Sequence, residues 1–172
     1  MSDVDIKDNF ISSSDCDFIV NFHKENFTRL TSRFIKTYNK TEIIRVNHLL
    51  SEPDHCPNLI KKLIADATVH IKTIDKEAFV NYTEIVKWPE GESQDAHIDF
   101  DWHPYTSILY LNDDYKGGQT KVDDKIIQPK KGRIITFKGS KLTHEVLKIT
   151  KGDRYTVPIW YSTLLTFRKN KI

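Results

Sequence analysis

The sequence predicts a mainly β fold, a sandwich or jelly roll with helices packed on one of its sheets. The first observation is that residues 1–90 contain no glycine, while all six glycines lie between residues 91 and 152. This division indicates a partly helical front followed by a turn-rich β region. Two helical patterns in the front and eight short β-rich runs after residue 78 are the other observations, and together they favour this fold class.

Two segments of the front have the periodicity of amphipathic helices. In "SSSDCDFIVNFHKENF" (12–27), serine and aspartate capping candidates precede Phe18, Ile19 and Phe22, which share a helical face. In "CPNLIKKLIADATVHIKTI" (56–74), Pro57 suits the first turn. The apolar residues there follow the 3.6-residue period: Leu59, Ile60, Leu63, Ile64, Ala67 and Ile71. The segment between the two helices, residues 37–55, is interpreted as a strand and a loop.

Short runs rich in β-branched and aromatic residues, bounded by turn residues, predict strands. They cover residues 78–88, 96–100, 105–112, 119–122, 125–128, 132–137, 143–149 and 154–167. A chain of 172 residues with 38% hydrophobic residues fits one domain with a sizeable core. We therefore expect a single domain over 1–172, with a helical front and support over 1–77 and the β core over 78–167.

Composition excludes several classes of protein. The sequence has no run of 18 apolar residues, and its start resembles no export signal. We therefore expect a soluble, cytoplasmic protein of a bacterium, or of the host cell if a phage encodes it. Cys16 and Cys56 are too few for a disulfide framework or a thiolate cluster, and we expect buried or idle thiols.

Charge is divided unevenly along the chain although its formal net value is only +2. Residues 1–115 carry 12 Lys/Arg against 20 Asp/Glu, and residues 116–172 carry 14 against 4. A basic half can attract an acidic polymer, peptide or anion. Solvated lysines on exposed strands explain the pattern more simply, so we do not expect a nucleic-acid surface.

The stretch "DAHIDFDWHP" (95–104) places His97, Asp99, Asp101 and His103 at every second position. In a strand all four would project from one face, roughly 7 Å apart, and one cation could use only a pair of them. His144 follows Asp99 by 45 residues, and a predicted hairpin brings Arg154 back beside it. Two histidines and one carboxylate form the facial triad of non-haem Fe(II) oxygenases, and an arginine can anchor a carboxylate co-substrate.

Five blocks extend this pattern in their order and spacing: "IVKWPEGESQDAHID", "SILYLND", "GGQT", "PKKGRIITF" and "THEVLKITKGDRYTVPIWY". Over residues 79–162 the chain thereby resembles the Fe(II)/2-oxoglutarate-dependent dioxygenases, in the prolyl 4-hydroxylase-like branch and its compact single-domain bacterial or phage type. The resemblance implies a double-stranded β-helix, which is a jelly roll with the iron at one mouth.

The resemblance also implies roles for individual residues. His97, Asp99 and His144 would be the metal ligands, and Arg154 would pair with the distal carboxylate of 2-oxoglutarate. Tyr110 matches a tyrosine that bonds to the same carboxylate, with a core aromatic as the alternative. The other predicted site residues are Thr156 and Val146, as pocket wall, and Trp88, where relatives often have a tyrosine. Asp101 and His103 would lie in a loop over the site, facing substrate or solvent.

Three departures from the family pattern, Trp88, Gln119 and Lys138, leave the substrate open. The resemblance implies hydroxylation of an unactivated C–H bond, with a prolyl residue of a peptide or protein as the first candidate and with release of succinate and CO2. It implies Fe(II), 2-oxoglutarate and O2, with ascorbate as a candidate reductant. A free amino acid, a small metabolite or a nucleic-acid base, stacked on Trp88 or Trp102, is the alternative substrate. A non-catalytic cupin-like metal-binding barrel and a zinc hydrolase are the alternatives from other classes.

Overall fold

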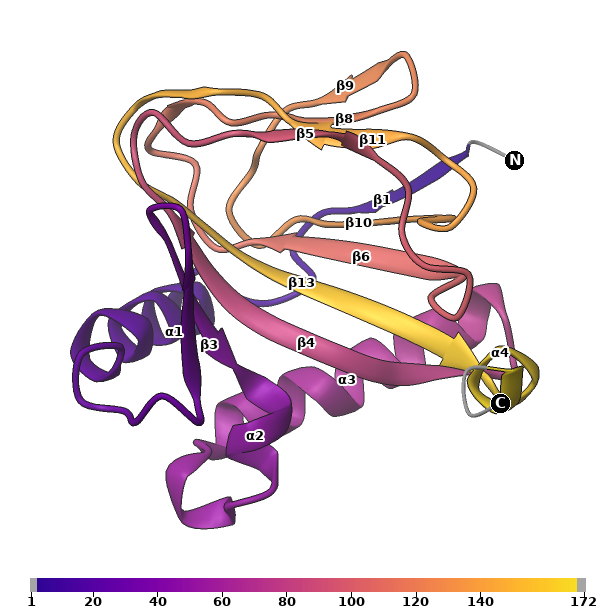
Figure 1. Cartoon of the computed structure of the whole chain (residues 1–172), viewed down its shortest axis with the longest axis horizontal. Helices are drawn as coiled ribbons and strands as arrows, with labels where there is room; N and C mark the ends of the chain where they lie inside the picture. The colour runs from indigo at the N-terminus through magenta and orange to yellow at the C-terminus, as the bar shows by residue number, and fades with distance from the viewer. Residues whose placement is uncertain (1–2, 170–172) are drawn as a thin grey trace.

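A computed structural model describes residues 3–169 (Figure 1). Its helices are α1 (Ser13–Asn26), α2 (Val46–Leu50), the 3-10 turn η1 (Pro53–His55), α3 (Asn58–Ile74) and α4 (Leu164–Lys169). Its strands are β1 (Val4–Lys7), β2 (Ile35–Tyr38), β3 (Thr41–Arg45), β4 (Ala78–Trp88), β5 (Gln94–His97), β6 (Tyr105–Tyr110), β7 (Lys116–Gly117), β8 (Thr120–Val122), β9 (Lys125–Ile127), β10 (Ile134–Phe137), β11 (His144–Val146), β12 (Ile149–Lys151) and β13 (Arg154–Thr163).

Two antiparallel sheets make up most of the fold. The larger has the order β1-β10-β6-β13-β4-β3-β2, the smaller has the order β5-β11-β8-β9, and β12 pairs with β7. The smaller sheet lies over one face of the larger sheet, while α2 and α3 lie against the other face of the larger sheet (Figure 1). This is the jelly-roll arrangement with helical support that the sequence predicts.

Strand β13 shows how the larger sheet separates core from cavity. Tyr155, Val157, Ile159 and Tyr161 belong to the hydrophobic cluster on the helical side. The alternate residues Arg154, Thr156, Pro158 and Trp160 line a cavity on the side of the smaller sheet. Successive side chains of a strand point to opposite faces, so one strand contributes to both.

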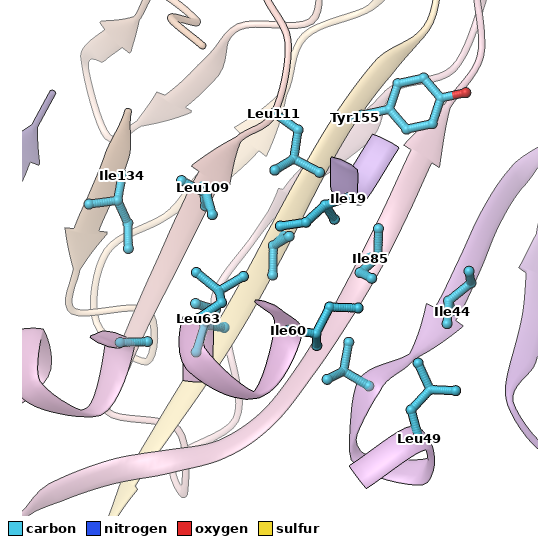
Figure 2. Close-up of a cluster of buried hydrophobic side chains, with 14 of the residues drawn as sticks. Ile19, Ile44, Leu49, Ile60, Leu63, Ile85, Leu109, Leu111, Ile134 and Tyr155 are labelled. Atoms are coloured by element: carbon cyan, nitrogen blue, oxygen red, sulfur yellow. The ribbon is translucent and has the colours of Figure 1, made fainter. Parts of the chain in front are cut away.

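The main core lies between the larger sheet and the helices (Figure 2). Helix α3 begins at Asn58, so Pro57 is its N-cap residue and not part of its first turn, and the helix buries Ile60, Leu63, Ala67 and Ile71 against the sheet. In α1, Ser12 caps the N-terminus by accepting a hydrogen bond from the Asp15 N–H at 3.1 Å. Cys16 and Cys56 are free thiols and both are buried.

The buried face of α1 differs from the predicted one. Its buried residues are Cys16, Ile19, Val20 and His23, spaced i, i+3, i+4 and i+7. Phe18, which was assigned to this face, is 46% exposed. Cys16 and the polar residue His23 complete the buried stripe. A prediction based only on large apolar residues therefore places the buried face too far toward solvent.

Residues 1–77 are not only helical as predicted, because they also contain β1, β2 and β3, which join the larger sheet. β1 pairs with β10, and the β2–β3 hairpin extends the sheet beyond β4. In β1 only Val4 is buried, which leaves no alternation to recognise. Residues 37–55, interpreted as a strand and a loop, form parts of the hairpin, α2 and η1.

Three other predicted strands end differently. Residues 96–100 are not a strand throughout, because β5 ends at His97. Residues 143–149 divide between β11 and β12. The last strand ends at Thr163 and α4 follows it.

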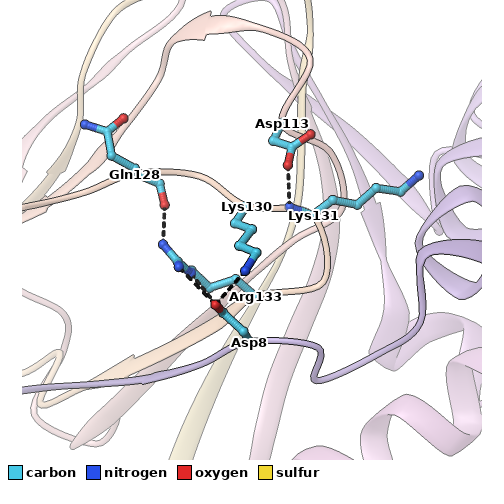
Figure 3. Close-up of polar contacts among 6 residues, drawn as sticks. All are labelled: Asp8, Asp113, Gln128, Lys130, Lys131 and Arg133. Carbon is cyan, nitrogen blue, oxygen red and sulfur yellow. Dashed lines mark hydrogen bonds and ion pairs between the residues drawn. The ribbon is translucent and has the colours of Figure 1, made fainter.

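Ion pairs between the acidic front and the basic second half explain part of the charge asymmetry (Figure 3). Lys130 Nζ donates to Asp8 Oδ2 at 2.8 Å, and Arg133 Nε donates to Asp8 Oδ1 at 2.6 Å. These two bonds hold the pKa of the Asp8 carboxyl well below its usual range. Lys131 Nζ bonds to Asp17 of α1 at 2.6 Å. None of the described helices has the length and apolarity needed to cross a membrane.

His70 makes the stability of the fold sensitive to pH. It is buried on α3, and its Nε2 contacts Thr136 Oγ1 at 3.0 Å, which in turn contacts Ser107 Oγ at 2.6 Å. Burial lowers the pKa of His70 below its ordinary value of 6.5, against the opposing effect of Asp5. The unfolded chain therefore binds the proton more readily, and the contribution of neutral His70 is lost as pH falls below about 6.5.

We expect His70→Gln to destabilise the protein above pH 7, by about 1 kcal/mol for a lost buried contact. The difference from the parent protein should shrink between pH 6.5 and 5, because only the parent's unfolded state is then stabilised by protonation of residue 70. Urea unfolding across this pH range measures both. A difference that grows toward acid pH would contradict this assignment.

Candidate metal centre and cavity

His97, Asp99 and His144 come together beside one end of the smaller sheet. His97 is the last residue of β5 and His144 is the first of β11, and the two are register partners. Asp99 follows two residues after the end of β5. One ligand atom from each residue lies within 4.8 Å of the others. Asp99 therefore meets the histidines by a bend of the chain after His97, and not by sharing a strand face with it.

Backbone carbonyls orient both imidazoles. His97 Nδ1 lies 2.9 Å from the Asp95 carbonyl oxygen, and His144 Nδ1 lies 2.9 Å from that of Leu142. A carbonyl oxygen only accepts, so each Nδ1 carries the proton and each Nε2 keeps its lone pair. The two Nε2 atoms lie 3.8 Å and 3.5 Å from Asp99 Oδ1. The three groups thus present their lone pairs to a common centre.

Asp99 is held from two directions. Its N–H donates to the Gly139 carbonyl oxygen at 2.9 Å, and Thr106 Oγ1 of β6 donates to its Oδ2. Burial raises the pKa of the Asp99 carboxyl, but the close approach of His144 and the hydrogen bond from Thr106 outweigh this effect, and the pKa lies below its usual range. A Cβ at Gly139 would overlap both Thr106 Oγ1 and Asp99 Oδ2. Glycine is therefore needed there for close approach.

The ligand cluster opens into a cavity of about 620 Å³ between the two sheets. Its walls include all three tryptophans of the chain, Trp88, Trp102 and Trp160. Apolar side chains from the larger sheet, Ile43, Val86, Ile108 and Pro158, form much of its floor. A cavity of this size holds a small co-substrate together with part of a larger ligand.

Arg154 lies in the wall of the same cavity and is only 1% exposed. Its guanidinium carbon lies 5.5 Å from the centre of the Trp88 ring and 5.7 Å from that of Tyr110. Its NH2 donates to Thr120 Oγ1 at 3.2 Å, and the Tyr110 hydroxyl donates to the same oxygen at 2.6 Å. Arg154 Nε and Trp88 Nε1 are buried without a hydrogen-bond partner among the described residues.

The predicted site residues occupy different positions around this cavity. Trp88, Val146 and Thr156 line it together with the cluster and Arg154. Tyr110 is fully buried beside the cavity, and burial raises the pKa of its hydroxyl.

Asp101 and His103 separate. Asp101 is exposed to solvent. His103 lines the cavity, and its Nε2 accepts a hydrogen bond from Asn81 Nδ2 at 3.1 Å.

Sequence reasoning missed Thr106, Thr120 and Gly139. Thr120 and Gly139 act through contacts with segments that are distant in sequence, and Thr106 acts through the carboxylate of Asp99 in the preceding loop. Thr120 ends the block "GGQT", which was the one available signal for it.

Residues 80–162 match the family model described as the 2OG-Fe(II) oxygenase superfamily. Human prolyl 3-hydroxylase 2 is 38% identical over 71 residues, which cover 37% of this chain and 10% of that protein. Chicken prolyl 3-hydroxylase 1 is 37% identical over the same shares. The match thus spans about a tenth of the length of these curated relatives.

Similar solved structures cover nearly the whole chain. A prolyl-4-hydroxylase from Pseudomonas putida has a TM-score of 0.74 at 15% identity, covering 93% of this chain and 92% of that one. The viral collagen prolyl hydroxylase of Paramecium bursaria Chlorella virus-1, solved with 2-oxoglutarate, has a TM-score of 0.64 at 18% identity, covering 94% and 96%. At these identities the likeness concerns the fold.

The family model covers the strands that carry the ligand cluster and Arg154, and the similar structures share the arrangement of both sheets. Residues 80–162 therefore match the 2OG-Fe(II) oxygenase superfamily, and the chain has the jelly-roll fold of the similar structures.

Proposed function

We propose that this protein is an Fe(II)- and 2-oxoglutarate-dependent dioxygenase that hydroxylates a prolyl residue of a peptide or protein. One observation carries the proposal: a two-histidine, one-carboxylate cluster and a buried arginine with an unpartnered donor line the same cavity. A cupin-like binding barrel or a zinc hydrolase accounts for the cluster but gives no use to the arginine.

The donor set fits Fe(II). Two imidazole nitrogens and one carboxylate oxygen on one side of a common centre are the facial triad, which leaves the other coordination positions open. We assign His97, Asp99 and His144 as the ligands. Iron held by these residues would allow O2 to react with 2-oxoglutarate, so that one oxygen atom would enter a C–H bond of the substrate and the other would enter succinate, with release of CO2.

The surroundings of Arg154 fit a carboxylate. A buried guanidinium requires an anion or several acceptors; one of its nitrogens donates to the Thr120 hydroxyl, and its Nε has no hydrogen-bond partner among the described residues. The unpartnered Nε and a second guanidinium N–H can donate in parallel to one carboxylate. Thr120 fixes the guanidinium plane and Tyr110 fixes Thr120, so we assign Tyr110 an indirect role. Trp88, Val146 and Thr156 would close the pocket around the co-substrate and keep water out.

The remaining cavity wall suits a prolyl side chain. Its aromatic and aliphatic residues, among them Trp102, Trp160 and Ile108, can hold a saturated ring near the metal ligands. The curated relatives are prolyl 3-hydroxylases and two of the similar structures are prolyl hydroxylases, which supports this substrate class. A free amino acid or small metabolite is the alternative.

The proposal also covers the domain organisation, the reductant and the cellular location of the protein. Within one domain, the helices of residues 1–77 would support a β core that strands β1 to β3 join and that ends with β13. Ascorbate would serve as a reductant, a cytoplasmic location is proposed, and no nucleic-acid partner is included.

Removing any one metal ligand should abolish succinate formation that depends on a prolyl peptide. We expect this of His97→Ala, Asp99→Ala and His144→Ala, with little loss of folding because all three border a cavity and not the core. Asp101→Ala and His103→Ala should still bind the metal. Anaerobic Fe(II) titration and circular dichroism measure binding and folding. Loss of iron in His103→Ala together with retention in His97→Ala would contradict the assignment.

Thr106→Val should weaken metal binding about tenfold, because a partner that orients a ligand typically contributes that much. The change keeps the shape of the side chain and removes the donor to Asp99 Oδ2. Thr83→Val is the matched control, because the Thr83 hydroxyl donates to the Pro158 carbonyl oxygen elsewhere in the same sheet. Competition titration with Co(II) compares the two. Equal metal affinities of Thr106→Val and Thr83→Val would show that Thr106 does not contribute to metal binding.

Arg154→Lys should raise the apparent KM for 2-oxoglutarate roughly tenfold to a hundredfold, since lysine cannot form two parallel bonds to a carboxylate. Fe(II) affinity without co-substrate should stay nearly unchanged. Tyr110→Phe should act in the same direction but more weakly, because it removes only the hydroxyl that holds Thr120. Unchanged dependence on 2-oxoglutarate in Arg154→Lys would contradict the anchor.

A further inference from the structure

Glu84 is an acidic residue in the cavity that the proposed reaction leaves without a role. It lies in the middle of β4, faces the cavity and is only 5% exposed. The other acidic residues in the described cavity wall are Asp99, in the metal cluster, and Glu145, which pairs with Lys121 of the smaller sheet at 3.1 Å. A buried carboxylate is costly to maintain, and an apolar residue of similar volume often stabilises a fold at least as well. Its presence therefore suggests a ligand.

The present partners of Glu84 form an incomplete cationic site. Lys36 Nζ lies 2.9 Å from its Oε1, and the Tyr82 hydroxyl donates to the same oxygen at 3.0 Å. Arg45, its cross-strand neighbour on β3, directs its guanidinium to the Arg33 carbonyl oxygen at 3.5 Å. Tyr82 belongs to the same strand as Glu84, so it holds the carboxylate in place whichever cation approaches.

Lys36 is a partner that can be exchanged. It belongs to β2, the edge strand of the larger sheet, which pairs with β3 alone. Its side chain is 40% exposed, against 6% for that of Glu84. A half-exposed lysine on four rotatable bonds can move into solvent at little cost, whereas the carboxylate cannot leave the cavity floor.

The position of Glu84 relates it to the metal cluster. Tyr82, Trp160 and Thr106 form one row across β4, β13 and β6, and Thr106 holds Asp99. Two strand spacings place Tyr82 roughly 10 Å from Thr106, and Glu84 is the next residue of β4 on that face. Ten ångströms is about three residues of extended chain. A basic side chain one to three residues from the target proline can therefore reach Glu84.

Resting on the proposed function, we infer that Glu84 selects peptides with a lysine or arginine near the hydroxylated proline, and that Lys36 takes the place of this substrate cation in the free enzyme. The indole of Trp160 and the phenol of Tyr82, whose ring centres are 5.7 Å apart, lie along the path between the two positions. Aromatic faces favour a passing ammonium or guanidinium group. Glu84 is thus a specificity-determining residue, and Lys36 competes with the substrate.

Peptide binding tests this without turnover. Capped peptides with one proline, flanked by lysine, glutamine or glutamate, are titrated into protein loaded with Mn(II) and 2-oxoglutarate. Because all three tryptophans line the cavity, their fluorescence reports binding. The lysine peptide should bind about tenfold tighter than the glutamine peptide, as expected of one charge-assisted hydrogen bond, and the glutamate peptide should bind most weakly.

Three variants separate selection from a structural ion pair. In Glu84→Gln the lysine, glutamine and glutamate peptides should bind with similar affinity. Glu42→Gln should keep the order of the three affinities, because Glu42 pairs with Lys87 and lies outside the cavity wall. Lys36→Met should tighten the lysine peptide up to about fivefold, the contribution of one partly exposed pair. A purely structural pair predicts instead that Lys36→Met leaves the lysine peptide no better bound.

Equal affinities of the three peptides for the parent protein, an order that survives Glu84→Gln, or weaker binding in Lys36→Met would each overturn the inference. Succinate formation with the same peptides separates this failure from failure of the proposed function. Turnover of all three peptides at equal KM contradicts only the role of Glu84 and leaves the proposed function in place. Absence of both binding and turnover contradicts the peptide substrate itself.

Discussion

The two attachments of Asp99 are the constraint on which the rest of the site depends. Its N–H bonds to Gly139 in the segment that leads to β11, and its carboxylate accepts from Thr106 of the larger sheet. His97 and His144 belong to the smaller sheet. The cluster therefore forms only when the two sheets are correctly placed over each other. The relative position of the two sheets thus sets the geometry of the three donors. A side chain at residue 139 would overlap both Thr106 and Asp99, so it cannot be accommodated.

The larger sheet combines a conventional core with a polar cavity because its faces have different chemistry. The helical face is a continuous apolar cluster. The opposite face carries Arg154, Glu84 and Thr106 among apolar and aromatic residues. Charges buried in this way require partners; in the described part of the chain Arg154 Nε has none, and Glu84 is paired with a half-exposed lysine and a tyrosine hydroxyl. A low dielectric around both groups would strengthen their interaction with any ligand of opposite charge.

How much could be predicted from the sequence depended on whether a feature is local. Strand β4 and helix α3 agree closely with the predicted bounds, because a β-rich run ended by turn residues and a 3.6-residue apolar period are both properties of one element. The ligand cluster followed from short spacing within one block together with a family resemblance. By contrast, β1 has a single buried residue, and Thr106, Thr120 and Gly139 owe their positions to cross-strand register and to loops. A single sequence contains no direct record of register, so these residues could be assigned only in three dimensions.

The alternation along β13 has a consequence for how this chain can vary in length. The strand lies in the middle of the larger sheet, between β6 and β4. An insertion or deletion of one residue near its start would exchange its two faces, which moves Arg154 toward the helices and a tyrosine into the cavity. In the turn between β8 and β9, an insertion after the exposed Asp124 would leave the faces of β8 and the hydrogen bond between Asp123 and Thr143 in place. Natural length variation and engineered fusions should therefore accumulate at that turn and be absent from β13.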